Sequence, residues 1–194
     1  MIRNLIFFVL LITTISCGQS YSPKPRGFFR IDLPEKQYQS LDSLLPYSFE
    51  YPVYTRFMND NRQEAESYWG NLIFPDFKGV IYLSYKPVNS SDDLEMYFED
   101  ARTFVNKHIP KASSLDDHIV NIPERDVYGF YHEIRGREVA SPVQFYVTDS
   151  LDHFLRGALY FNVAPDNDSL APVIDFIRED ILHLLTTLEW KNLD

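Results

Sequence analysis

Two amphipathic helical patterns, set among segments typical of β-strands, constrain the fold of this chain more than any other feature. Apolar residues recur at helical spacing over Asp92–Ile109 and over Ser169–Leu188, so each segment predicts a helix with one apolar face. Segments rich in β-branched and aromatic residues, bounded by turn formers, predict four strands: Lys78–Lys86, Asp126–Arg135, Pro142–Thr148 and His153–Val163. Grouped strands with separate helices indicate an α+β fold, a mainly antiparallel sheet with both long helices packed on it.

The order of these elements is similar to that of the PsbP/Mog1-like sandwich and indicates one globular domain over residues 27–194. Weaker strand signals lie at Gly27–Leu33, Pro46–Tyr51 and Tyr68–Phe74. The polar segment Asn59–Ser67 is expected to be a loop or one helical turn. Asp168 or Ser169 can cap the second helix, because a side-chain oxygen there can accept a hydrogen bond from a first-turn N–H.

The composition excludes several classes of function. The 194 residues include 28 acidic and 18 basic side chains, and the resulting net charge of −10 opposes binding to the phosphates of nucleic acids. One cysteine allows neither an internal disulfide nor a multi-thiolate metal site. With 45% hydrophobic and 15% aromatic residues, the chain can bury a sizeable core. We therefore expect an acidic globular domain without a nucleic-acid partner, a cofactor or a metal.

Residues 1–16 have the plan of a secretory signal peptide. Arg3 supplies positive charge, Leu5–Ile12 is an unbroken apolar run, and small or polar residues follow it up to Ser16. This apolar run would reach only about 12 Å as a helix, far short of a hydrocarbon core of about 30 Å. The segment therefore predicts a cleaved signal rather than a membrane-spanning helix.

The single cysteine, Cys17, lies where cleavage would occur. Its position resembles a bacterial lipobox, in which the thiol receives lipid chains such as palmitate, although Thr14 replaces the usual leucine. The alternative is an ordinary signal peptide that leaves Cys17 as an accidental thiol. Each buried methylene contributes about 0.8 kcal/mol, so the three acyl chains of a lipoprotein would anchor it permanently. Residues 17–26 would then be the acylated cysteine and its tether, and the absence of acidic residues after Cys17 favours the outer membrane, facing the periplasm.

Neither a catalytic site nor a metal site is predicted. The five histidines form no His-x-His or HExxH pair, and the sequence has no Gly-x-Ser-x-Gly elbow. Asp116, Asp117 and His118 are expected at a solvated turn where a loop meets a strand, with a role as ligand or base as the alternative. His183, four residues after Glu179, is expected to interact with the dipole at the end of the second helix.

Arg156 lies in the middle of the last predicted strand. Phe154, Ala158 and Tyr160 share its face, because residues two apart in a strand point to the same side. We expect a structural role in which Arg156 is either buried against a carboxylate or extends its charged head to solvent.

The segment just beyond the tether is a candidate for partner binding. It contains Arg26, Phe28, Phe29 and Arg30, and both arginine and aromatic side chains are enriched at protein interfaces. The alternative is an edge strand that buries Phe28 or Phe29.

The tripeptide Asp-Ser-Leu occurs three times, with its serines at Ser43, Ser150 and Ser169. It resembles the Asp-(Ser/Thr)-aliphatic motif for O-glycosylation of exported bacterial proteins, so these serines are candidate glycosylation sites. The alternative is that Asp-Ser marks turns and helix starts, which Asp and Ser favour.

Five segments together resemble the family of the gliding motility-associated lipoprotein GldD. They are PKPRGFFRIDLP (23–34), PYSFEYP (46–52), HFLRGALYFNV (153–163), DSLAPVIDFIREDILHL (168–184) and TLEW (187–190). The resemblance spans nearly the whole mature chain and is weak over Thr55–Ser67 and Lys111–Asp117. It implies an envelope lipoprotein needed for gliding, in bacteria whose adhesin delivery depends on the type IX secretion system. It implies no enzymatic activity, and only Cys17 transfers as a functional position.

We therefore expect a non-enzymatic, lipid-anchored component or accessory of the gliding and type IX secretion machinery, with protein partners in that apparatus. The alternative is a periplasmic enzyme or ligand-binding domain that acts on envelope carbohydrate or peptide. A pocket that gathers His118, His132 or His153 with a carboxylate would favour this alternative. A third possibility is an assembly or stability factor for a partner.

Overall fold

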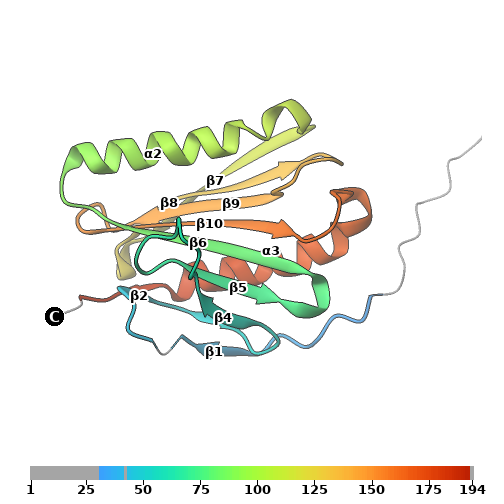
Figure 1. Cartoon of the computed structure of the whole chain (residues 1–194), viewed down its shortest axis with the longest axis horizontal. Coiled ribbons are helices and arrows are strands. Elements are labelled where there is room, and N and C mark those ends of the chain that lie inside the picture. Colours follow the sequence, from blue (N-terminus) through green and yellow to red (C-terminus); the bar gives the residue numbers. More distant parts are fainter. Residues whose placement is uncertain (1–30, 42, 193–194) are drawn as a thin grey trace, which may run out of the picture. The chain divides into compact units, whose positions relative to one another are not determined.

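A seven-stranded antiparallel sheet is the centre of the fold (Figure 1). The computed structural model describes residues 31–41 and 43–192. From edge to edge the strands are β4 (Arg56–Asn59), β5 (Gly70–Phe74), β6 (Gly79–Pro87), β10 (His153–Phe161), β9 (Val143–Thr148), β8 (Val127–Arg135) and β7 (Ser114–Ile122). Every neighbouring pair is antiparallel. The four predicted strands are confirmed as β6, β8, β9 and β10, and so is the mainly antiparallel sheet.

Two strands of this sheet were not predicted, because neither has the alternation of a half-buried strand. β7 has polar residues on both faces and, among the described strands, pairs only with β8, at the edge of the sheet. The prediction of a turn at Asp116–His118 is wrong, since these residues lie inside β7. β4 is short and largely exposed at the opposite edge.

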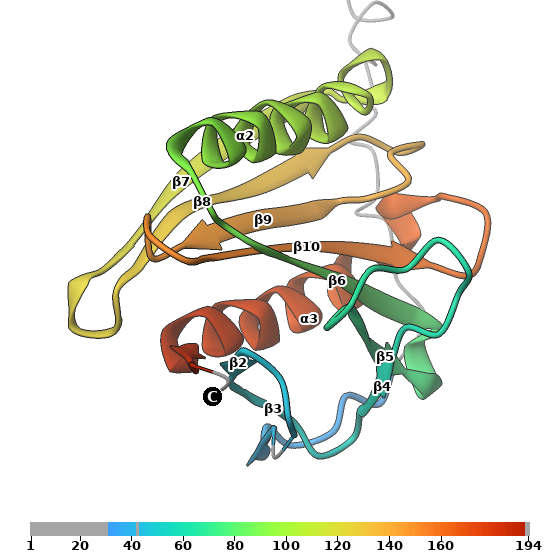
Figure 2. The same ribbon diagram turned by 60° about the vertical axis from the view of Figure 1, so that its left-hand side comes forward.

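The two predicted helices are confirmed as α2 (Ser91–Asn106) and α3 (Asn167–Thr187), which lie on opposite faces of the sheet (Figure 2). The Ser90 hydroxyl caps α2 by accepting a hydrogen bond from the N–H of Asp93. α3 begins earlier than predicted, with Asp166 at its N-cap position. The prediction that Asp168 or Ser169 caps this helix is therefore wrong, because both lie within its first turn.

Shorter elements complete the structure. They are β1 (Tyr38–Ser40), β2 (Tyr47–Ser48), β3 (Glu50–Pro52), β11 (Glu189–Trp190) and the 3-10 turns η2 (Pro75–Phe77), η3 (Ile109–Lys111) and η4 (Pro123–Arg125). β1 pairs with β3, and β11 pairs with β2. The weak strand signals at Pro46–Tyr51 and Tyr68–Phe74 are thus confirmed as β2, β3 and β5. Of the remaining weak strand signal, Gly27–Leu33, residues 31–33 are described and are not in a strand. Residues 60–67 form the expected loop.

The face of the sheet toward α3 is closed. Its buried side chains include Leu72, Phe74, Ile81, Leu83, Phe145, Leu155, Leu159, Ile177 and Ile181. The chain from residue 36 to residue 54 completes this cover: Tyr47 and Phe49 are fully buried, and the Tyr47 ring lies 5.8 Å from the ring of Tyr85. Burial of apolar side chains on this face contributes most of the favourable free energy of folding.

A buried carboxylate connects the 36–54 segment to α3. Asp180 is only 1% exposed, and it accepts hydrogen bonds from Lys36 Nζ (2.6 Å), the Tyr38 hydroxyl (3.0 Å) and the Tyr54 hydroxyl (2.7 Å). Burial, together with the charge of Asp180, raises the pKa of the Tyr38 and Tyr54 phenols. Both phenols therefore stay protonated and continue to donate to the carboxylate, so this buried charge is fully compensated.

The opposite face is only partly covered by α2. Tyr97 and Ala101 of the helix pack on Val88 and on Phe154 of β10. Further along the helix, Val105 packs on Ile134 of β8. Phe104, an apolar residue of the same helix, is 41% exposed.

Candidate functional site

A cleft of about 530 Å³ lies on the α2 face of the sheet. Its walls come from α2, from β6 and β10, and from the loop between β4 and β5. It is lined by Arg62, Glu66, Trp69, Tyr82, Ser84, Lys86, Tyr97, Asp100, Ala101, Phe104, Phe154, Arg156, Ala158 and Tyr160. Clefts of this size hold small-molecule ligands, and aromatic linings with a few polar groups are typical of them.

Strand alternation places the floor of the cleft. Phe154, Arg156, Ala158 and Tyr160 of β10 line it together, which confirms the prediction that they share one face. In β6 the residues Tyr82, Ser84 and Lys86 do the same, since the register pairs Ser84 with Arg156. The ligand-sized space therefore depends on a polar and aromatic strip of two central strands, beside which α2 supplies one wall.

Arg156 is the distinctive group of this floor. Its Nη2 donates to Gln144 Oε1 at 2.7 Å, and its guanidinium lies 4.3 Å from the centroid of the Phe104 ring. Burial lowers the pKa of Arg156, which remains a cation. Within residues 31–41 and 43–192 it forms no ion pair, so it is neither buried against a carboxylate nor free in solvent.

The other cations of the cleft are paired. Arg62 forms an ion pair with Asp60. Lys86 Nζ lies 2.7 Å from Glu66 Oε1. Positive charge without a carboxylate partner is therefore concentrated at Arg156.

A row of buried polar side chains continues from Arg156 beneath α2. Gln144 is 1% exposed, and its Nε2 has no hydrogen-bond partner in the described protein. The register places Gln144 opposite His132, whose Nε2 also has no partner there. His132 Nδ1 lies 2.7 Å from Asp117 Oδ1. In a neutral ring with its proton on Nδ1, facing the carboxylate, Nε2 is an acceptor, and this row then holds a spare donor at Gln144 and a spare acceptor at His132.

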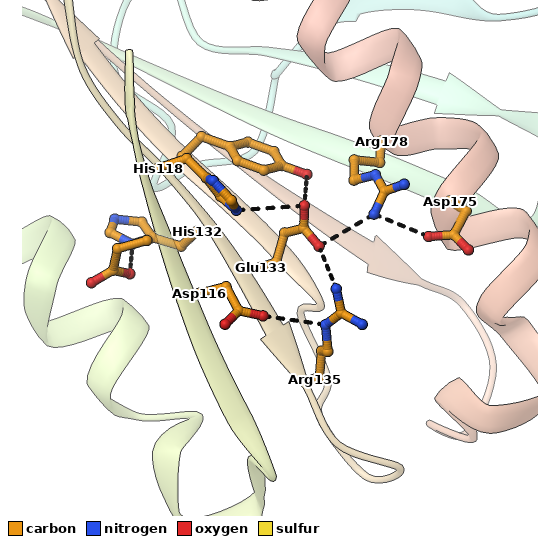
Figure 3. Close-up of polar contacts among 9 residues, drawn as sticks. Asp116, His118, His132, Glu133, Arg135, Asp175 and Arg178 are labelled. Carbon is orange, nitrogen blue, oxygen red and sulfur yellow. Dashed lines mark hydrogen bonds and ion pairs between the residues drawn. The ribbon is translucent and has the colours of Figure 1, made fainter.

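A second polar cluster lies on the α3 side of β7 and β8 (Figure 3). Glu133 is at its centre, within 3.3 Å of Arg135 and Arg178, 3.4 Å of the Tyr131 hydroxyl and 3.8 Å of His118. Burial acts to lower the pKa of Arg178, but the charges of Glu133 and nearby Asp175 raise it. Several members are solvent-exposed, and such ion pairs contribute little free energy each. We interpret this cluster as a structural connection between β7, β8 and α3.

Two further histidines, His153 and His183, also have structural surroundings. His153 is buried, with its Nδ1 2.8 Å from the Tyr85 hydroxyl. His183 stacks on Tyr38 at 3.6 Å between ring centroids, and its Nε2 lies 2.7 Å from Glu50 Oε2. The partner of His183 is therefore Glu50, from a distant part of the sequence. Neither histidine lines the cleft, nor does His118 or His132.

Only some of the residues predicted as interaction or modification sites lie within the described part of the chain. Cys17, Arg26, Phe28, Phe29 and Arg30 lie outside the described residues. Of the candidate glycosylation sites, Ser150 and Ser169 are exposed, whereas the Ser43 hydroxyl is buried without a hydrogen-bond partner in the described part of the chain. The three serines stay predictions.

Two important features were missing from the sequence-based prediction. The loop that carries Arg62, Glu66 and Trp69 reaches the cleft, and nothing in its polar sequence indicated this. Asp180 could have been found, because it lies three residues after Ile177 and four before Leu184, on the apolar face of α3. A carboxylate at such a position requires a buried partner.

The fold and the cleft define the class of this protein: an α+β domain on an antiparallel sheet, with a ligand-sized cleft on one face. The described residues contain no group of three His, Cys, Asp or Glu side chains able to hold a metal ion. They also contain no helix with the length and apolar character needed to cross a membrane.

The chain belongs to the family described as "Gliding motility lipoprotein GldD", whose model matches residues 18–190. The predicted resemblance is confirmed, and it gives the protein a role in gliding motility and a lipid-anchored place in the cell envelope. Among solved structures, the chain is similar to PsbP (CyanoP) from Synechocystis sp. PCC 6803, with 10% identity and a TM-score of 0.48, over 87% of this chain and 99% of that chain. No curated protein matches it.

Proposed function

We propose that this protein is a non-enzymatic, lipid-anchored component or accessory of the gliding and type IX secretion machinery, held at the outer membrane and facing the periplasm. The observation that carries the proposal is the family match, which begins at residue 18, directly after Cys17. The anchor would be the acylated thiol of Cys17, and the domain would act by binding partners in that apparatus.

The chemistry of the cleft supports binding rather than catalysis. The described residues of its lining offer aromatic rings and charged groups but no histidine. Among the described residues of the lining, Ser84 is the one serine, and none is a histidine that could activate it. The cleft therefore favours a recognition site, for an envelope carbohydrate, a peptide or a smaller ligand, as part of the non-enzymatic role.

Replacing Cys17 by Ser tests the anchor. We expect the Cys17→Ser protein to lose palmitate labelling, to move from the membrane to the soluble fraction, and to fail to restore gliding in a deletion strain. Ser16→Ala is the matched control, because it changes a neighbouring small residue and leaves the thiol. A Cys17→Ser protein that stayed at the membrane and restored gliding would refute the anchoring role.

Crosslinking in intact cells tests the assignment to the machinery. The acylated protein, purified from the envelope after crosslinking, should carry gliding or type IX secretion components. The same capture from a strain with Cys17→Ser should lose them if anchoring positions the domain. If partner levels fall when the protein is deleted, without any crosslinked contact, a role as a stability factor replaces the proposed one.

A further inference from the structure

We propose that the α2-face cleft binds a small monocarboxylate with an aromatic or apolar body, whose carboxylate is held by Arg156. This inference rests on the proposed role of the cleft as a binding site, and it names the chemical class of the ligand. Nothing in the family match specifies a ligand.

The state of Arg156 is the first reason. A guanidinium has five N–H donors, and one hydrogen bond from it, to Gln144, occurs among the described residues. Burial already disfavours its charge, as the lowered pKa shows, and no carboxylate of the described chain neutralises it. A buried cation is stabilised when an anion pairs with it and accepts its spare donors. An external anion would supply both.

The number and shape of the donors select the kind of anion. Of the three cations that line the cleft within residues 31–41 and 43–192, two are already paired, with Asp60 and with Glu66. The remaining single positive charge matches a monoanion, and the Asp100 carboxylate on the lining would repel a dianion such as phosphate more strongly than a monoanion. A planar guanidinium also matches the two oxygens of a carboxylate.

The walls select the body of the ligand. Six aromatic side chains line the cleft: Trp69, Tyr82, Tyr97, Phe104, Phe154 and Tyr160. They offer apolar area and ring faces within a space of about 530 Å³, which suits one small molecule rather than an extended polymer.

Gln144 acts as a positioning residue for Arg156. Its Oε1 accepts from Arg156 Nη2, and the register places Gln144 opposite His132, which contacts Asp117. The hydrogen bond from the buried Gln144 therefore holds the Arg156 guanidinium in place before a ligand binds. A donor fixed in this way loses little conformational entropy on binding.

Tryptophan fluorescence can measure this binding directly. The chain has two tryptophans, Trp69 in the cleft and Trp190, which stacks on His153 at 5.2 Å. In the detergent-solubilised full-length lipoprotein carrying Trp190→Phe, Trp69 is the sole reporter. The probes are N-acetylphenylalanine, its neutral amide and phenyl phosphate, each titrated in the same detergent.

We expect N-acetylphenylalanine to change the Trp69 signal saturably, and the amide to bind at least ~10-fold more weakly, because it cannot pair with a cation. Arg156→Met should weaken the carboxylate by at least ~10-fold and leave the amide unchanged. Arg102→Met, the same change at an exposed arginine of α2 paired with Glu99, should alter neither.

Equal affinity for the acid and its amide, or no binding of the acid, would overturn the inference. Tighter binding of phenyl phosphate would also overturn it and identify phosphate as the anion. A cleft-filling Ser84→Tyr variant, shown to be folded by circular dichroism, separates this result from the binding role. If Ser84→Tyr abolishes gliding but the unfilled cleft does not bind the carboxylate probe, only the proposed ligand class is rejected. If Ser84→Tyr leaves gliding normal, the cleft is rejected as the functional site.

Discussion

The two faces of the central sheet differ in how completely their buried polar groups are hydrogen-bonded. On the face toward α3, the buried carboxylate of Asp180 is surrounded by three donors from the 36–54 segment. On the face toward α2, the guanidinium of Arg156 has one neutral partner in the described chain. The nearby Gln144 and His132 each keep a buried nitrogen without a partner there.

This difference indicates a division of roles. Buried polar groups are normally satisfied within the protein, because an unpaired one costs free energy. At Asp180 the α3 face follows this rule, which serves stability, whereas the buried Ser43 hydroxyl in the covering segment has no partner in the described part of the chain. The α2 face departs from it beside a ligand-sized cleft, and departures of this kind are expected where a protein retains capacity for a ligand.

The largest expected effect is on the closed face. Asp180→Ala removes the acceptor shared by Lys36, Tyr38 and Tyr54, and we expect it to lower the free energy of unfolding by about 3 kcal/mol. Urea unfolding measures this change. Glu179→Ala is the control, since Glu179 is exposed and 3.8 Å from Lys36, and it should cost less than about 0.5 kcal/mol. Equal losses in the two variants would mean that Asp180 is not the specific connection.

Close packing on the same face predicts the next effect. A methyl group at Gly157 would overlap the ring of Phe145, which is itself buried. We expect Gly157→Ala to cost about 1–3 kcal/mol in thermal or urea unfolding, because the core must shift to accept it. Adding Phe145→Leu makes room, so the double variant should lose less than the sum of the single losses. Strict additivity would show that the two sites do not share the packing constraint.

Arg156 lies one residue earlier in β10, on the partly covered α2 face, which we call the open face. The expected effect on stability is smaller there. Arg156→Met removes a partly buried cation without an ionic partner in the described chain, and Met fills similar space. We expect the free energy of unfolding to change by less than about 1 kcal/mol in either direction, although the cleft loses its cation. Urea unfolding, compared with Arg102→Met, measures this. A loss as large as that of Asp180→Ala would remove the distinction between the faces.

The same contrast explains what could be predicted from the sequence. The apolar periodicity of α3 and the alternation in β6 arise from burial, so these elements of the closed face could be predicted directly. β7 was missed because polar residues lie on both its faces. The cleft was missed because Trp69 and Arg62 reach it from a polar loop, and Gln144 meets Arg156 only through the pairing of β9 with β10. Contacts between distant segments leave no local pattern in the sequence.

The smallest expected effect links the open face to pH. His108 lies after α2, with its ring 6.4 Å from that of Tyr160, and burial, followed by the charges of Arg156 and Lys107, lowers its pKa below 6.5. Below pH 6.5 His108 therefore binds more protons in the unfolded chain than in the folded one. The stability that its neutral form allows above this pH is lost as the pH falls toward the pKa of His108 in the folded protein. In an NMR titration, Arg156→Met should raise the pKa of His108 part of the way toward 6.5, because burial remains. Arg102→Met should leave it unchanged, and no shift in Arg156→Met would show that the guanidinium charge is already neutralised in the cleft.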